Sequence, residues 1–141
     1  MLIYEYTNDT NLRMATNKTT EKVVFPELSY SITGILFATH NELGQYAKEK
    51  QYGNEIEKRL KEIKLPYQRE VIVSNSGNIL DFVIDSKIAI ELKSVRQLTR
   101  EHYRQIQNYL QQTNLKLGIL VNFRDQYLKP VRIIRIDSHN S

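Results

Sequence analysis

The sequence predicts an α/β domain in which helices flank a mixed β-sheet, and three observations support this fold class. Apolar residues recur at helical spacing from Pro26 to about residue 63. The middle of the chain then alternates with a period of two. Another helical stretch separates these strands from two later ones, which favours a parallel crossover. The predicted order is therefore helix, helix, three strands, helix, strand, strand.

The composition is that of an ordinary globular protein with a single domain. The chain has 141 residues, of which 40% are hydrophobic and 26% charged. It contains no cysteine, so a metal ion would need oxygen or histidine ligands. No apolar run approaches the length of a membrane span, and the start of the sequence does not resemble a secretion signal. We therefore expect a cytoplasmic protein that does not enter a membrane.

The N-terminal part divides into an arm and two helices. Residues 1–24 are rich in Thr, Asn and Lys, so we expect a poorly ordered arm with space for one short strand, followed by a folded domain over residues 25–138. The first helix follows Pro26 and is interrupted at Gly44. The second helix covers "YAKEKQYGNEIEKRLKEI" and ends before Pro66.

The remaining elements follow from alternation and capping. The three central strands are "YQREVIVS", "NILDFVI" and "KIAIELKSV". Thr99 is a suitable N-cap for a helix that runs to about Thr113. The near-continuous apolar run "LKLGILVNF" is typical of a buried strand, and "VRIIRI" completes the sheet.

The strands on either side of residues 85–87 predict a hairpin with charge on one face. If these residues form the turn, Ile84 faces Ile88, Phe82 faces Ile90 and Leu80 faces Leu92, which places all three apolar pairs on one face. The same register brings Asp81 opposite Glu91 on the other face. Lys93 shares the face of Glu91 because strand side chains alternate.

Two chemical interpretations of this charged face remain open. Facing carboxylates repel each other unless something compensates, and oxygen ligands suit a hard divalent cation such as Mg²⁺ or Mn²⁺. Alternatively, the face is simply solvated, and Lys93 offsets the two acids.

The spacing of these residues resembles a known family. Asp81, nine further residues and then Glu91-Leu92-Lys93 are similar to the core of the PD-(D/E)XK nuclease superfamily. The stretch "GQYAKEKQY" resembles the motif of the GxxExxY protein family, a branch of that superfamily, through Glu49 and Tyr52. The stretch departs from that motif where Tyr46 replaces the first glycine. Downstream, "RQIQNYL" resembles the Gln-x-x-x-Tyr element of RecB-like exonucleases, and the resemblance extends from residue 28 to residue 136.

The resemblance implies a restriction-endonuclease-like fold and a metal-dependent nuclease. In such nucleases the positions of Asp81 and Glu91 hold Mg²⁺ or Mn²⁺, helped by the main-chain carbonyl at the position of Leu92. The lysine at the position of Lys93 orients or activates the attacking water and steadies developing charge. The implied reaction is hydrolysis of phosphodiester bonds, most simply in DNA, by a metal-activated water.

Three further residues have both a functional and a structural interpretation. The resemblance makes Glu49 a third metal-side carboxylate, although an acid near a helix start also interacts well with the dipole. Gln105 and Tyr109, four residues apart, would line the active cleft, or they would be an exposed amide and a core aromatic. For His102 we expect a structural or solvated role.

Basic residues concentrate in the second half of the chain. Arg96, Arg100 and Arg104 could form a ladder of phosphate contacts near the start of the third helix, or they only solubilise the surface. The net charge of +4 is compatible with nucleic-acid binding without demonstrating it.

Other enzyme classes lack their motifs, while two other functions stay open. The sequence has no phosphate-binding glycine loop, no G-x-S-x-G elbow and no H-E-x-x-H. The chain could be a non-catalytic module that keeps the fold and binds nucleic acid or a protein. It could also be a dimeric structural protein that associates through "VRIIRI" as an edge strand. For a nuclease, the expected partner is DNA, with RNA as an alternative, and a homodimer or protein partner would supply specificity.

Overall fold

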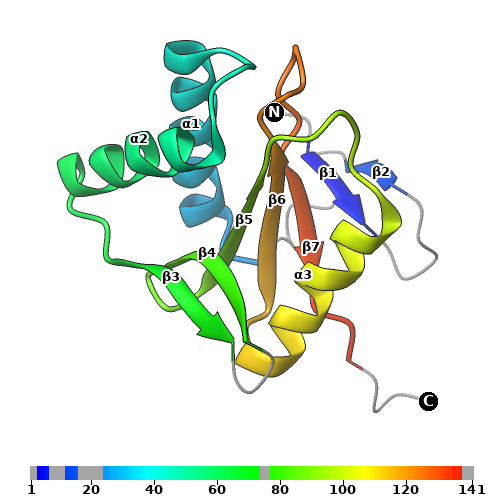
Figure 1. Cartoon of the computed structure of the whole chain (residues 1–141). Helices are drawn as coiled ribbons and strands as arrows, with labels where there is room; N and C mark the ends of the chain where they lie inside the picture. The colour runs from blue at the N-terminus through cyan, green and yellow to red at the C-terminus, as the bar shows by residue number, and fades with distance from the viewer. Residues whose placement is uncertain (1–2, 7–11, 16–23, 74–76, 138–141) are drawn as a thin grey trace.

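A mixed β-sheet lies between helices on its two faces (Figure 1). The computed structural model describes residues 3–6, 12–15, 24–73 and 77–137. Within these residues the sheet has seven strands in the order β2-β1-β7-β6-β5-β4-β3. The elements are β1 (Ile3–Tyr6), β2 (Leu12–Ala15), α1 (Pro26–Leu43), α2 (Glu49–Glu62), β3 (Tyr67–Val73), β4 (Asn78–Ile84), β5 (Ile88–Lys93), α3 (Arg100–Thr113), β6 (Leu117–Asn122) and β7 (Val131–Ile134).

The predicted element order from Pro26 onward is confirmed. Strands β5 and β6 run parallel and are joined through α3, as the helical connection predicted. The pairs β3–β4, β4–β5 and β6–β7 are antiparallel, so the sheet is mixed. Each face carries its own core, with α1 and α2 covering one and α3 the other.

The predicted N-terminal arm contributes strands to this sheet. Residues 3–6 pair in parallel with β7 and antiparallel with residues 12–15. Apart from Val24, the other residues of the predicted arm lie outside the described residues. In the part of the chain that the structure describes, no helix is both long and apolar enough to cross a membrane.

The prediction that "VRIIRI" is an edge strand is wrong, because β7 lies inside the sheet. It pairs with β6 on one side and with β1 on the other. Arg132, in the middle of this strand, is buried and donates from Nη2 to the carbonyl of Val24 at 2.7 Å. Association through this edge is therefore not available to the fold.

The predicted hairpin register is confirmed at its turn end and fails at its open end. Phe82 pairs with Ile90 and Ile84 pairs with Ile88. Leu80, however, packs in the core under α3, whereas Leu92 packs with Phe82 under α1 and α2. A regular strand would place residues 80 and 82 on the same face, so β4 breaks its alternation at Asp81.

The neighbouring strand is irregular at the same level. Glu70 in β3 has a φ of 57°, in the left-handed region that non-glycine residues seldom occupy. Its neighbours Arg69 and Val71 pair with Phe82 and Leu80, which places Glu70 across from Asp81. The two strands therefore change face together, and this shared irregularity is the reason that the prediction for Leu80 is wrong.

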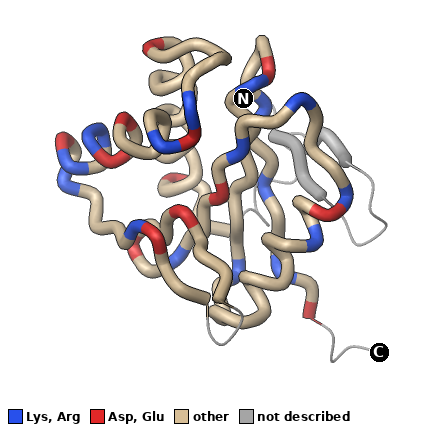
Figure 2. The backbone as a smooth tube through the Cα atoms, viewed as in Figure 1, with Lys and Arg blue, Asp and Glu red and all other residues tan. Residues whose placement is uncertain are grey.

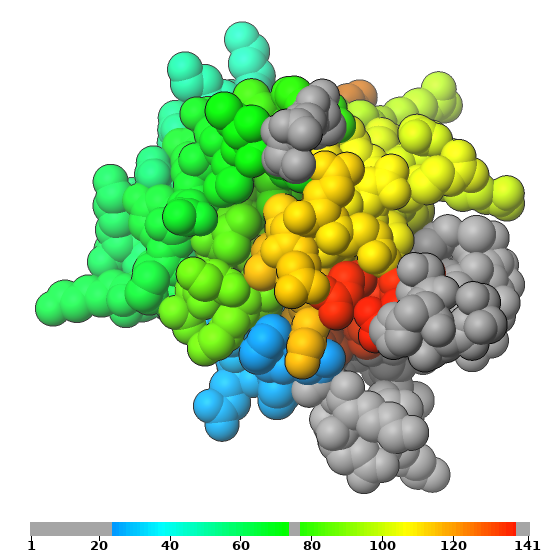
Figure 3. Space-filling model, turned by 90° about the horizontal axis from the view of Figure 1, so that it is seen from below, coloured from blue at the N-terminus to red at the C-terminus, as the bar shows by residue number. Residues whose placement is uncertain are grey.

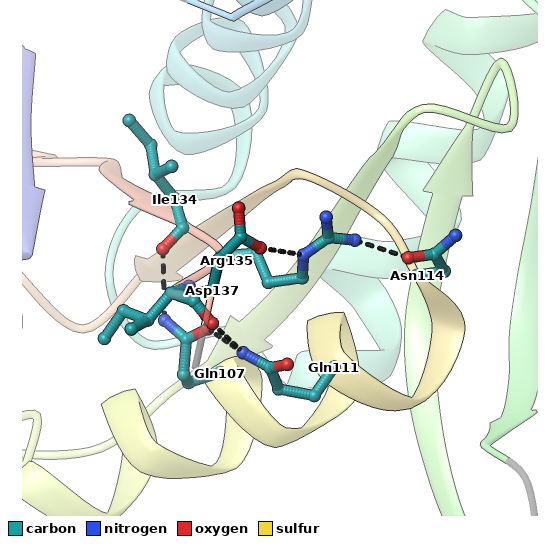
Figure 4. Close-up of polar contacts among 7 residues, drawn as sticks. Gln107, Gln111, Asn114, Ile134, Arg135 and Asp137 are labelled. Atoms are coloured by element: carbon teal, nitrogen blue, oxygen red, sulfur yellow. Dashed lines mark hydrogen bonds and ion pairs between the residues drawn. The ribbon is translucent and has the colours of Figure 1, made fainter. Parts of the chain in front are cut away.

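The C-terminal segment is fastened to α3 at the far end of the molecule (Figure 4). Gln107 donates to the carbonyl of Ile134 at 3.1 Å and accepts from the Ile136 N–H at 2.9 Å. Arg135 donates to Asn114 at 2.7 Å and pairs with Asp137 at 3.2 Å. Figure 3 shows this lower face, where the end of α3 lies between the β3–β4 hairpin and residues 131–137. Arg135 therefore helps to hold the C-terminal segment against the end of α3.

Candidate metal centre

Asp81 and Glu91 meet where the ladder between β4 and β5 ends. The last pair in the register is Phe82 with Ile90. Beyond it, the N–H of Asp81 donates to Glu91 Oε1 at 3.2 Å, and the N–H of Leu92 donates to Asp81 Oδ2 at 2.7 Å. Each carboxylate therefore binds the backbone of the opposite strand. The predicted proximity of the two acids is confirmed.

Glu91 is deeply buried, with 5% of its surface exposed. Burial first, and then the charge of Asp81, raise the pKa of Glu91 to about 9. Lys93 lies 3.7 Å from Glu91 and acts in the opposite direction without overcoming these effects. Glu91 therefore keeps its proton at neutral pH unless further positive charge stabilises its carboxylate. A hard divalent cation would supply it, so the residues present fit Mg²⁺ or Mn²⁺.

A cleft of about 290 Å³ opens beside this pair, between α2 and the strands β3 to β5. Figure 2 shows charges of both signs where the start of α2 approaches these strands. The lining residues are Glu49, Lys50, Gly53, Arg69, Glu70, Asp81, Phe82 and Leu92. Leu92 is the predicted carbonyl ligand, and its own N–H already holds the Asp81 carboxylate.

Glu49 shares this cleft with Asp81, as the sequence led us to expect. It is the first residue of α2 and is exposed. Over the described ranges, no three His, Asp or Glu side chains stand close enough together to hold a metal ion. Glu49 therefore lies at the cleft that Asp81 also lines, and metal binding by Glu49 stays a prediction.

Tyr52 explains how Glu49 is positioned. Its buried ring stacks on Phe123, with the ring centroids 4.2 Å apart. Its hydroxyl donates to the Gly44 carbonyl and accepts from the Ala47 N–H at 3.2 Å. These bonds fix the segment that leads into α2, so the tyrosine of the motif sets where the helix begins.

Lys93 ends β5 with its side chain half-buried beside Glu91. Its carbonyl accepts from the Phe123 N–H at 2.9 Å. Val95, two residues after Lys93, is held by the side chain of Asn122. The Asn122 Oδ1 accepts from the Val95 N–H at 3.0 Å, and its Nδ2 donates to the Val95 carbonyl at 2.8 Å. Asn122 was not among the predicted site residues, although a polar residue at the end of the apolar run "LKLGILVNF" was a usable signal.

The predicted α3 residues behave differently from one another. Tyr109 is buried, and burial followed by the charges of Glu91 and Asp81 raises its pKa to about 12. Gln105 lies one turn earlier and is half-buried. Neither residue lines the cleft described above. His102 has the expected structural role, because its Nδ1 accepts from the Thr99 N–H at 2.9 Å and caps the helix.

The predicted arginine ladder is exposed near the start of α3. Arg96, Arg100 and Arg104 are all on the surface. Arg104 pairs with Glu101 at 3.1 Å, in an exposed contact that contributes little to stability. Their contact with nucleic acid stays a prediction.

Arg69 and Glu70 were not among the predicted site residues either. Both line the cleft, and Glu70 stands across from Asp81. The interpretation of "YQREVIVS" as a regular alternating strand concealed them, because alternation assigns neighbouring residues to opposite faces. No local signal in the sequence marks the left-handed backbone at Glu70.

Comparison with known proteins gives a family for this arrangement. The family model described as PD-(D/E)XK nuclease superfamily matches residues 26–136. The solved structure "Crystal structure of SSO0001" is similar at 20% sequence identity and a TM-score of 0.47, over 77% of this chain and 68% of that one. No curated protein matches the sequence. The narrower resemblance to the GxxExxY family stays a prediction.

Proposed function

The chain belongs to the PD-(D/E)XK nuclease superfamily, and we propose that it is a metal-dependent nuclease that hydrolyses phosphodiester bonds in DNA. The observation that carries this proposal is the pairing of Asp81 with Glu91, each bound to the opposite strand's backbone, with Lys93 3.7 Å from Glu91. Two acids and one base from the family's core motif therefore lie together beside the cleft that Asp81 lines.

Asp81, Glu91 and the main-chain carbonyl of Leu92 would hold Mg²⁺ or Mn²⁺. Glu49, on the opposite wall, would add a ligand directly or through water. When bound, such a cation lowers the pKa of a water molecule and polarises the scissile phosphate. The raised pKa of Glu91 supports this assignment, because a buried carboxyl next to another acid ionises readily only when a cation compensates it.

Lys93 would orient the attacking water and stabilise negative charge that develops on the phosphate. Its ammonium is held beside Glu91 and is mostly shielded from solvent, so its charge is weakly screened. Tyr109 would support the acid pair, and Gln105 would reach a phosphate oxygen or the water. Arg96, Arg100 and Arg104 would contact the DNA backbone outside the cleft.

We also propose membership of the GxxExxY branch. The support is structural: Tyr52 fixes the entry into α2, and Glu49 consequently faces the cleft. The replacement of the first glycine by Tyr46 is compatible with this role, because Tyr46 is exposed and carries Arg124 over its ring.

The test is a cleavage assay on single-stranded, duplex, nicked and branched DNA and on RNA, with Mg²⁺, Mn²⁺ or EDTA. We expect cleavage of DNA with either ion, none with EDTA, and none by Asp81→Asn or Lys93→Ala. Intact substrates throughout the panel would overturn the proposal. Cleavage that survives Asp81→Asn would overturn the site.

One observation favours the alternative of a non-catalytic binding module with the same fold. Within the described residues, three metal-ligating side chains do not come together. Such a module would bind DNA or a protein without a divalent ion. Calorimetry that shows DNA binding but no Mg²⁺ or Mn²⁺ binding would support this alternative.

A further inference from the structure

We propose that Arg69 is a phosphate-binding residue of the cleft and that Gly53 is a glycine so that the Arg69 guanidinium can lie there. The inference rests on the proposed function for the identity of its ligand, the phosphate backbone of DNA. It adds Arg69 on β3 and Gly53 on α2 to a site so far built from Asp81, Glu91 and Lys93.

The guanidinium of Arg69 is held in place before any ligand binds. Its Nη1 donates to Asn54 Oδ1 at 2.8 Å and to Glu57 Oε1 at 3.1 Å. Its Cζ lies 5.6 Å from the centre of the Phe82 ring. Because contacts on α2 and β4 fix the group, little side-chain entropy remains to be lost when it binds a phosphate.

Gly53 makes this position possible. A Cβ at residue 53 would lie 2.5 Å from Arg69 Nη2, which is closer than real Cβ atoms approach, and in tight contact with its Cζ at 3.2 Å. Gly53 is buried in the second turn of α2, where alanine is intrinsically the better helix former. The helix therefore gives up propensity at the one place where the guanidinium lies against its backbone.

The chemistry of the cleft explains why an arginine is needed. Its lining includes the carboxylates Glu49, Glu70 and Asp81, which repel a polyanion, while Lys50 and Arg69 are its cations. A guanidinium binds phosphate oxygens in a bidentate manner. The hydrogen bonds to Asn54 and Glu57 both use Nη1, while Nη2 and Nε lie along Gly53, which also lines the cleft.

Glu57 anchors Arg69 and is itself anchored. The Tyr67 hydroxyl donates to Glu57 Oε2 at 2.8 Å, and this bond, ahead of the contacts with Arg69, lowers the pKa of Glu57. The competing interpretation is that Arg69 is only a strut between β3 and α2. If Arg69 is only a strut, displacing its guanidinium without removing the charge should lower stability alone. If Arg69 binds phosphate, the same displacement should weaken DNA binding.

Gly53→Ala is the variant that makes this separation. The added methyl meets only the far end of a flexible side chain, so the helix keeps its fold while the guanidinium must move. Gly34→Ala in α1 is the matched control, since a Cβ at Gly34 meets nothing within 4 Å. Arg69→Lys keeps the charge without the bidentate fork, and Arg59→Ala removes an ion-paired arginine of α2 that does not line the cleft.

The measurements are melting temperature, affinity for a fluorescein-labelled DNA oligonucleotide at several salt concentrations in EDTA, and KM and kcat with Mg²⁺. For Gly53→Ala we expect a melting temperature equal to or a few degrees above wild type. We also expect roughly tenfold weaker DNA binding, a salt slope lower by about one, and a raised KM with kcat nearly unchanged. Arg69→Lys should weaken binding too, and both controls should match wild type.

Wild-type affinity, salt slope and KM in Gly53→Ala and Arg69→Lys would overturn the inference, and a lowered melting temperature alone would identify a strut. If wild type binds DNA but does not cleave it, the nuclease proposal fails and the Arg69 comparison still stands on the binding data. If wild type does not bind DNA, both proposals fail.

Discussion

The two ends of the β4–β5 hairpin differ in the side chains that hold them together. At the turn end, Ile84 pairs with Ile88 and Phe82 with Ile90, and all four side chains are buried in one core. At the open end, Asp81 and Glu91 replace apolar residues, and the ladder stops. The same hairpin thus contributes stability at one end and chemistry at the other.

The difference lies in how the backbone groups are satisfied. Near the turn, strand pairs satisfy each other, and burial of apolar area stabilises them. At the open end, the N–H groups of Asp81 and Leu92 bind carboxylates, and the raised pKa of Glu91 records the cost of burying an acid there. The predictions below test whether stability and activity separate along the hairpin in this way.

The largest expected effect separates the two lysines of the hairpin. Lys93→Ala removes the half-buried charge beside Glu91, so we expect cleavage to fall by about 10³-fold. Lys87→Ala, at the turn, removes an exposed lysine paired with Asp85 at 3.2 Å, and activity should stay within about twofold. Single-turnover cleavage rates measure both. Equal rates for the two variants would contradict a functional role for the open end.

A core truncation at the turn end should have the reverse pattern. Ile90→Ala removes a buried side chain from the core under α1 and α2, and we expect a loss of about 2–5 kcal/mol in the free energy of unfolding. Asp81→Asn should cost less than about 1 kcal/mol while it abolishes cleavage. Urea unfolding followed by circular dichroism measures both. A larger stability loss in Asp81→Asn than in Ile90→Ala would invert the comparison.

A change at Asn122 should affect both stability and cleavage activity. Asn122→Ala removes both hydrogen bonds that clamp Val95, so we expect a loss of about 2 kcal/mol in stability. Activity should fall at a temperature where the variant is still fully folded, because the segment after Lys93 loses its attachment to β6. Unchanged kcat in the folded variant would leave Asn122 with a purely structural role.

The pH dependence of stability should differ between wild type and a Glu91→Gln variant. The pKa of Glu91 is raised from 4.5 to about 9, so the metal-free native state keeps a proton that the unfolded chain releases. Native stability from this group is therefore present at low pH and is lost as the pH rises from about 4.5 toward 9. Glu91→Gln should remove this dependence and become more stable than wild type at pH 8, with little difference at pH 4. Urea unfolding in EDTA across this range measures it, and parallel curves for the two proteins would contradict the raised pKa.

The regular parts of the molecule were predictable from the sequence because they follow local rules. The alternation in "KIAIELKSV" gave β5 and the turn-end register, and Thr99 marked the start of α3. Asp81 and Glu91 were found because the register of their apolar neighbours determined their position. Regularity was sufficient wherever one face of a strand had to be buried.

The misses occur where distant segments decide the structure. The left-handed backbone at Glu70 and the change of face at Leu80 occur together in β3 and β4, and alternation cannot anticipate them. The edge position of "VRIIRI" failed because residues 3–6, more than 120 positions earlier, pair with it. Arg69 was hidden for a related reason, since its place depends on a glycine in another element.

Calorimetric titration of Mn²⁺ into wild type and Asp81→Asn at pH 7.5 tests the central claim that the open end of the hairpin binds a divalent cation. Wild type should bind Mn²⁺ and release protons as Glu91 ionises, which appears as a binding enthalpy that changes with the buffer's ionisation enthalpy. Asp81→Asn should bind at least about tenfold more weakly, a difference of about 1.4 kcal/mol. Equal affinity in the two proteins, or no Mn²⁺ binding by wild type, would contradict the claim.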